Sequence, residues 1–140
     1  MIGLQASPVH GSRSWWDRPT DAAERTELVA KITYHNRGGA LVSLRGPVPG
    51  ALFEFGTIEV SNAAMTAMES SHLYAWPLLL RHVACAGAPD ATTTERNLRA
   101  IRMKEGRVVS EFRTSNGCQL WIITHLGDGG YTTFLVSDLG

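Results

Sequence analysis

The last third of the chain constrains the fold more than any other stretch of the sequence. From Gly106 onward, three runs rich in β-branched, apolar and aromatic residues span about 107–114, 118–125 and 131–137. Turn-forming residues separate these runs, Ser-Asn-Gly at 115–117 and Gly-Asp-Gly-Gly at 127–130. Asn-Gly supplies the positive φ values that a tight hairpin requires. The pattern predicts a three-stranded antiparallel meander.

These predicted strands carry apolar residues on both faces. The candidates for the core are Val109, Phe112, Leu120, Ile122, Phe134 and Val136. Trp121 falls on the opposite face from its neighbours Leu120 and Ile122, because successive side chains of a strand alternate. We therefore expect helices to cover one face of the sheet. The other face needs the N-terminal hairpin, a tryptophan-bearing arm or a partner chain.

Three short helices are predicted before these strands, at about 63–70, 73–85 and 93–103. Ser61 or Asn62 can cap the first helix. Pro77 is expected in the first turn of the second, where the missing N–H costs little. Thr92 and Glu95 have the capping-box spacing for the third. The predicted fold class is therefore α+β, with short helices packed on the meander.

The first 50 residues predict a helix and a β-hairpin ahead of this core. Asp21 and Glu24 have capping-box spacing, which favours a helix at about 20–30. Two β-prone runs, 32–36 and 40–44, flank a Gly-Gly pair and predict the hairpin. A Gly-Pro-Val-Pro-Gly segment then breaks regular structure. The expected division is an arm, a helix plus hairpin, and an α+β core domain, at residues 1–19, 20–50 and 51–140.

Trp15 and Trp16 stand out in an arm that otherwise has no helical or strand period. Aromatic side chains bury a large area, so a pair of indoles favours docking on the domain. The alternative is a binding anchor for a partner, since tryptophan is enriched in interface hot spots.

The composition gives no global electrostatic reason to expect a nucleic acid or a membrane as partner. Lys plus Arg and Asp plus Glu each number 13, so the formal net charge is zero. Cys85 and Cys118 have no CxxC spacing, which favours reduced thiols and gives no sign of a metal or redox site. No run is long enough to span a bilayer, and the N-terminus lacks a secretory pattern. We expect a cytoplasmic protein without a cofactor.

Histidines and one aspartate are the candidates for chemistry. Arg81 and His82 lie in the second predicted helix, where they either form a site or stabilise its C-terminal end. His125 and Asp128 flank the second turn of the meander. Together with His82 they form the best arrangement for a small metal-dependent hydrolase or nuclease, although their spacing matches no metal signature.

The third predicted helix leads into the densest basic stretch of the chain. Arg99 and Arg102 are three residues apart and share a face. The stretch also contains Arg96, Lys104 and Arg107, but Glu95 and Glu105 dilute it. A solvated face is the favoured interpretation, and DNA binding is an alternative.

Four segments resemble a family of small proteins found on plasmids and other mobile elements of bacteria. They are FEFGTIEVSNAAM, LLRH, GRVVSEFRTSNGCQLWIIT and YTTFLV, at residues 53–65, 79–82, 106–124 and 131–136. The family has a C-terminal motif, RLLSxYRTxxGxxLWIITEADRSxTTILLPEEY, and its members are often labelled "type I restriction endonuclease subunit M". The resemblance covers residues 53–137. It implies a mobile-element accessory protein of unknown activity.

The chain departs from that family in two loops, 85–90 and 125–130, where acidic and aromatic residues of the family are replaced. It also lacks the glycine loop and the Asn/Asp-Pro-Pro-aromatic motif of a DNA methyltransferase. We therefore expect a small non-enzymatic protein-binding or regulatory protein of a mobile genetic element, acting in defence or counter-defence. Its expected partner is another protein or a second copy. The alternatives are the hydrolase or nuclease and the DNA-binding protein.

Overall fold

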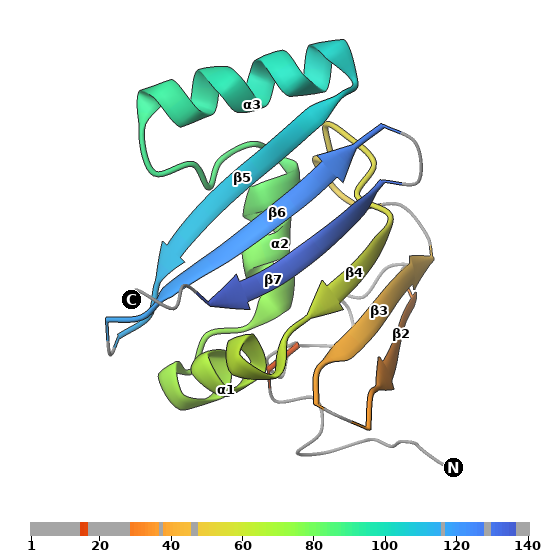
Figure 1. Cartoon of the computed structure of the whole chain (residues 1–140), viewed down its shortest axis with the longest axis vertical. Coiled ribbons are helices and arrows are strands. Elements are labelled where there is room, and N and C mark those ends of the chain that lie inside the picture. Colours follow the sequence, from red (N-terminus) through yellow and green to blue (C-terminus); the bar gives the residue numbers. More distant parts are fainter. Residues whose placement is uncertain are drawn as a thin grey trace.

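The computed structural model describes residues 15–16, 29–36, 38–45, 48–115, 117–127 and 130–136. These residues form one six-stranded mixed sheet and three helices (Figure 1). The strands are β2 (Val29–Tyr34), β3 (Ala40–Arg45), β4 (Thr57–Val60), β5 (Gly106–Arg113), β6 (Gln119–Leu126) and β7 (Tyr131–Val136). The helices are α1 (Asn62–Ser71), α2 (Ala75–Val83) and α3 (Ala91–Met103).

The prediction of a three-stranded meander is wrong, although the α+β class is confirmed. β5, β6 and β7 do pair in antiparallel order. They form only half of a sheet whose strand order is β2-β3-β4-β7-β6-β5. β4 pairs in parallel with β7 and antiparallel with β3, so it joins the hairpin to the meander. A four-residue strand that pairs with residues more than 70 positions away leaves no local signal in the sequence.

The predicted N-terminal helix falls mostly on residues outside the described part of the chain. Its expected last residues, Val29 and Ala30, instead begin β2. The hairpin therefore starts earlier than the sequence pattern indicated. Its two glycines, Gly38 and Gly39, both have positive φ, as the tight turn requires.

One face of the sheet carries the core, and α1 and α2 lie on that face (Figure 1). Leu120, Ile122 and Phe134 are fully buried beneath these helices. They are joined by the alternate residues of β3 and β4 and by the inward sides of α1 and α2. Val136 packs half-buried against the same cluster. Val109, also a core candidate, is half-buried and belongs to the opposite face.

The three helices begin at caps of different kinds. Ser61 caps α1, and its hydroxyl accepts a hydrogen bond from the Ala64 N–H at 3.0 Å. α3 begins earlier than its capping-box pattern suggested, because Asp90 is the N-cap and its carboxylate accepts from the Thr93 N–H at 2.7 Å. This bond lowers the pKa of Asp90. α2 has no side-chain cap, and Pro77 occupies its first turn.

The outer edge of β5 is closed by side-chain and main-chain partners. Asn97 of α3 is 1% exposed and bonds both main-chain groups of Val109. Its amide donates to the Val109 carbonyl at 2.8 Å, and its oxygen accepts from the Val109 N–H at 2.9 Å. The Glu111 N–H donates to the Gly87 carbonyl at 2.9 Å. These contacts satisfy groups that would otherwise invite another strand to pair.

Substitution of Gly56 tests whether the main chain before β4 must lie in close contact with the residue before β7. Gly56 and Gly50 both have positive φ, but only at Gly56 would a Cβ atom overlap a neighbour, the Gly130 carbonyl oxygen. Gly50→Ala should therefore cost about 1 kcal/mol of unfolding free energy, the price of the backbone conformation alone. We expect Gly56→Ala to cost at least about 2 kcal/mol more, because the main chains must separate. Equal losses in urea denaturation would contradict this close approach.

Candidate functional site

His82 lies at the centre of a buried chain of hydrogen bonds and not at the surface. The ring is fully buried on α2. Its Nδ1 is 2.7 Å from the Ser110 hydroxyl and its Nε2 is 2.8 Å from the Thr124 hydroxyl. Thr124 is in turn 2.6 Å from the Thr132 hydroxyl, which donates to the Phe55 carbonyl at 2.8 Å. The chain thus joins α2, three strands and the segment before β4.

The direction of these bonds fixes the tautomer of His82. Because the Thr132 hydroxyl gives its proton to a carbonyl, its oxygen accepts from Thr124. The Thr124 oxygen then accepts from the protonated Nε2 of His82. Nδ1 is left as the acceptor for the Ser110 hydroxyl. Every side-chain polar group in this series of hydrogen bonds has a partner, and the imidazole of His82 is neutral.

Burial lowers the pKa of His82 to about 3 from its ordinary value of 6.5. A histidine that stays neutral over the physiological range and contacts buried hydroxyls is suited to holding a core together. Its neighbour Arg81 points elsewhere, since its guanidinium lies 5.0 Å from the centre of the Phe112 ring. Arg81 and His82 therefore do not act on a common target.

The second histidine candidate lies on the other face of the sheet. Thr124 faces α2 through its bond to His82, so the next residue, His125, points away from the helices. Its ring stacks on Tyr131 of the neighbouring strand, with the centroids 4.7 Å apart. Asp128 lies outside the described residues. Within the described residues, no three His, Cys, Asp or Glu side chains gather in a metal-binding arrangement.

Trp15 and Trp16 lie in the core, where they close the start of α2. Their exposed fractions are 1% and 3%. The Trp15 carbonyl accepts from the Ala75 N–H at 2.7 Å, and the Trp16 carbonyl accepts from the Trp76 N–H at 2.8 Å. These N–H groups belong to the first turn of a helix, which has no internal acceptors for them. Two main-chain carbonyls thus replace the missing side-chain cap.

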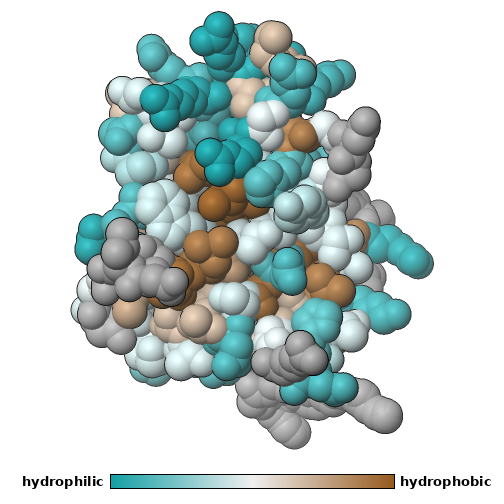
Figure 2. Space-filling model, viewed as in Figure 1, coloured by the Kyte–Doolittle hydropathy of each residue, from teal (hydrophilic) through white to brown (hydrophobic). Residues whose placement is uncertain are grey.

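Trp121 belongs to a group of apolar side chains on the sheet face that no described helix covers (Figure 1). We call this face the open face. Trp121 is directly opposite Leu135, and Ile123 is directly opposite Val109. All four side chains are half-buried. Figure 2 looks onto this face and shows hydrophobic side chains gathered at its centre with hydrophilic ones around them.

Arginines of α3 and β5 flank the open face at the β5 edge. Arg96, Arg99 and Arg107 line a groove between α3 and β5, together with Val109 of the open face. Glu105 lines the same groove, so its charge is positive but not uniformly so. Arg102 lines a second depression on α3, together with Arg99, Arg96 and Glu95. The predicted arginine pair therefore lies together in this depression, and Arg99 also lines the groove.

Sequence reasoning missed the polar residues that matter most to the packing. Ser110, Thr124 and Thr132 occupy inward positions of β5, β6 and β7, among residues that are otherwise apolar. Asn97, one of the most buried residues of α3, was also missed. The available signal was a hydroxyl residue at an inward position of each of three neighbouring strands, which calls for a shared polar partner.

No protein-family model, curated protein or solved structure matches the chain. Within the described residues, no helix combines the length and the apolar character needed to cross a lipid bilayer.

The buried His82 should make stability depend on pH. An unfolded histidine binds a proton near pH 6.5, but the native ring does so only near pH 3. The free energy of unfolding should therefore fall as the pH drops below 6.5, by about 2 kcal/mol at pH 5 from this residue alone. Urea denaturation between pH 5 and 7.5, at steps of about half a unit, measures the slope.

Two glutamine variants identify the residue responsible. His82→Gln should be less stable at neutral pH and should lose most of the slope, because an amide does not titrate. His35→Gln replaces an exposed histidine and should keep the pH dependence of the free energy of unfolding. A slope that survives in His82→Gln would assign the pH dependence to another group.

Proposed function

We propose that the protein is a small non-enzymatic binding protein whose open face holds a protein partner with an apolar centre and an acidic margin. The observation that carries the proposal is the block of Val109, Trp121, Ile123 and Leu135 on a face that no described helix covers. The resemblance described above supports an accessory role on a mobile genetic element, in defence or counter-defence.

The block has the composition of an interface centre. Trp121 is the residue type most enriched in hot spots, and it lies directly opposite Leu135. The pair Val109 and Ile123 extends the apolar area towards α3. Contiguous apolar area on a folded surface is a mark of binding sites. A partner that covers these four side chains would remove them from water.

Charge favours a partner with carboxylates at its margin. Arg96, Arg99 and Arg107 line the groove that begins at Val109. Arginine pairs well with carboxylates and adds specificity to a contact through its planar fork. Rim charges of this kind chiefly set the rate and selectivity of association.

A nucleic acid fits the same surface less well. Glu111 is directly opposite Trp121 on the open face, and its side chain is 16% exposed. Gln119 bonds this carboxylate, and Arg113 lies 4.0 Å from it. A fixed carboxylate beside the central tryptophan repels phosphates. The hydrolase or nuclease has no support from the geometry, since His82 and His125 point to opposite faces of the sheet.

A charge placed in the block should abolish partner binding. The partner is captured from host lysate, identified, purified, and titrated against the wild-type chain by calorimetry. We expect Ile123→Glu to weaken the affinity at least about tenfold, or 1.4 kcal/mol, because a carboxylate enters a dry contact. Raising the salt concentration should weaken wild-type binding, since the rim is charged.

Control variants separate the open face from general effects. Leu98→Glu places the same charge on an exposed position of α3 and should bind as the wild type does. Leu135→Thr introduces a residue that is compatible with a strand and should also lower the affinity for the partner. It tests the open face even if Ile123→Glu does not fold. Equal binding by Ile123→Glu, a nucleic acid as the only ligand, or a homodimer through this face in light scattering would each overturn the proposal.

A further inference from the structure

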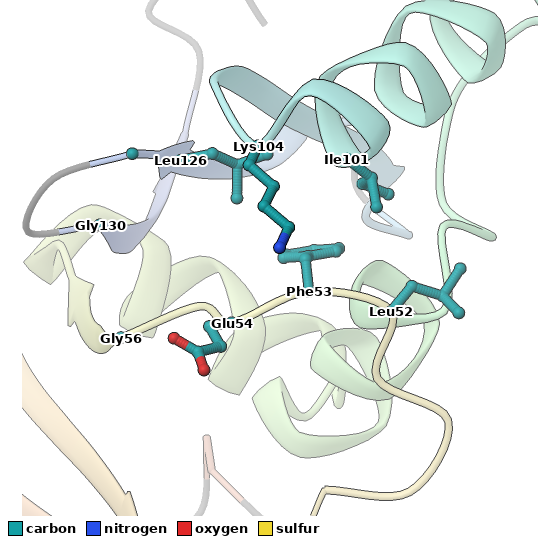
Figure 3. Close-up of a pocket in the computed structure, with 9 residues that line it drawn as sticks. Leu52, Phe53, Glu54, Gly56, Ile101, Lys104, Leu126 and Gly130 are labelled. Atoms are coloured by element: carbon teal, nitrogen blue, oxygen red, sulfur yellow. The ribbon is translucent and has the colours of Figure 1, made fainter.

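A second cavity lies at the opposite end of β6 from the Trp121 block, and none of the features above accounts for it. It has a volume of about 440 Å³ and is lined by the segment before β4, the end of α3, the last residue of β6 and the two glycines Gly127 and Gly130. Phe53, Ile101 and Leu126 give it apolar walls, and Lys104 reaches over it (Figure 3). Its volume is within the range of small-ligand sites.

The wall formed by residues 52–56 is held in place from both sides. The Leu52 N–H donates to the Val83 carbonyl at 2.8 Å, and the Phe55 carbonyl accepts from Thr132 at 2.8 Å. Phe53 meets the buried His82 ring edge-on, with the centroids 5.5 Å apart. Gly56 lies so close to Gly130 that no side chain fits between them. This wall of the cavity is therefore in place before any ligand arrives.

Lys104 is in an unusual position for a lysine. It follows the last residue of α3 in the left-handed conformation, with φ 58° and ψ 35°. Glycine is the residue that usually occupies this place at the end of a helix, because a Cβ atom is disfavoured there. A lysine in this conformation carries a conformational cost. His72 ends α1 in the same way, with φ 58° and ψ 34°, so the case for a site here depends on the cavity and on the direction of the lysine side chain.

The described lining of the cavity carries one cation, Lys104, and one anion, Glu54, and the two side chains point in different directions. Figure 3 shows the Lys104 ammonium directed towards the Phe53 ring, while the Glu54 carboxylate points away from it. Among the described residues, Lys104 has no ion-pair partner. A cation without a partner above an aromatic floor is complementary to a ligand that is apolar at one end and negative at the other.

We infer that this cavity binds a small carboxylate with an aromatic or aliphatic body. The body lies against Phe53, Ile101 and Leu126, and the carboxylate pairs with the ammonium of Lys104. A single flexible ammonium suits a monoanion. A phosphate is usually held by the planar fork of an arginine, and no arginine lines this cavity among the described residues.

The test uses 3-phenylpropionate as the probe and the full chain labelled with ¹⁵N. We expect saturable shifts of the Ile101, Lys104 and Leu126 amide signals, with a Kd of about 1 mM or below. The neutral analogue 3-phenylpropanamide should bind at least about tenfold more weakly, since it cannot form the ion pair. No saturable shift up to about 10 mM probe, or equal binding of the amide, would overturn the inference.

Variants of Lys104 assign the charge to this residue. Lys104→Gln keeps a long polar side chain and should lose at least about tenfold in affinity, whereas Lys104→Arg should retain binding. Lys104→Gly relieves the left-handed conformation, so its denaturation midpoint should rise while probe binding is lost. This opposite movement of stability and affinity is not expected of a lysine with a purely structural role. Unchanged affinity in Lys104→Gln would overturn the assignment.

Discussion

A chain of hydrogen bonds through His82 joins the helical layer of the protein to its sheet. Ser110, Thr124 and Thr132 bring one hydroxyl from each of three neighbouring strands, and the last of these reaches the carbonyl of Phe55. Each buried polar group left without a partner would cost about 1–3 kcal/mol. The register of β5, β6 and β7 and the position of α2 are therefore coupled, because a shift in any one of them would break the chain.

The same series of hydrogen bonds positions the open face and the cavity under Lys104, the two surfaces to which we assign binding. Thr124 faces inward to reach His82, so Ile123 and His125 on either side of it must face outward onto the open face. The Phe53 ring packs edge-on against His82 and forms the floor of the cavity under Lys104. One buried histidine thus fixes which side chains face the proposed protein partner and which wall the proposed carboxylate would meet.

The sheet is closed at one edge and left open on one face. Asn97 and Gly87 satisfy the outward main-chain groups of β5, which blocks the addition of another strand there. The apolar block beside that edge has no such protection among the described residues. A fold that closes the β5 edge yet leaves Trp121 and Ile123 only half-buried is suited to recognition through side chains, with Arg96 and Arg107 as a charged margin. Side-chain recognition beside this edge permits specificity without strand pairing to β5.

The sequence alone determined the local elements and left their assembly undecided. The Asn-Gly turn, the alternation around Trp121 and the cap at Ser61 are local, since each depends on residues a few positions apart. Alternation also placed Trp121 on the second face correctly, and with it part of the candidate site. The parallel pairing of β4 with β7 and the hydrogen bonds through His82 join residues up to 77 positions apart, so only the tertiary structure decided them. The sequence favoured docking of Trp15 and Trp16, but only the tertiary structure decided that they dock at the start of α2. Residues close in sequence determine which side chains of a strand point to the same face. Packing in the shared core determines which elements those side chains contact.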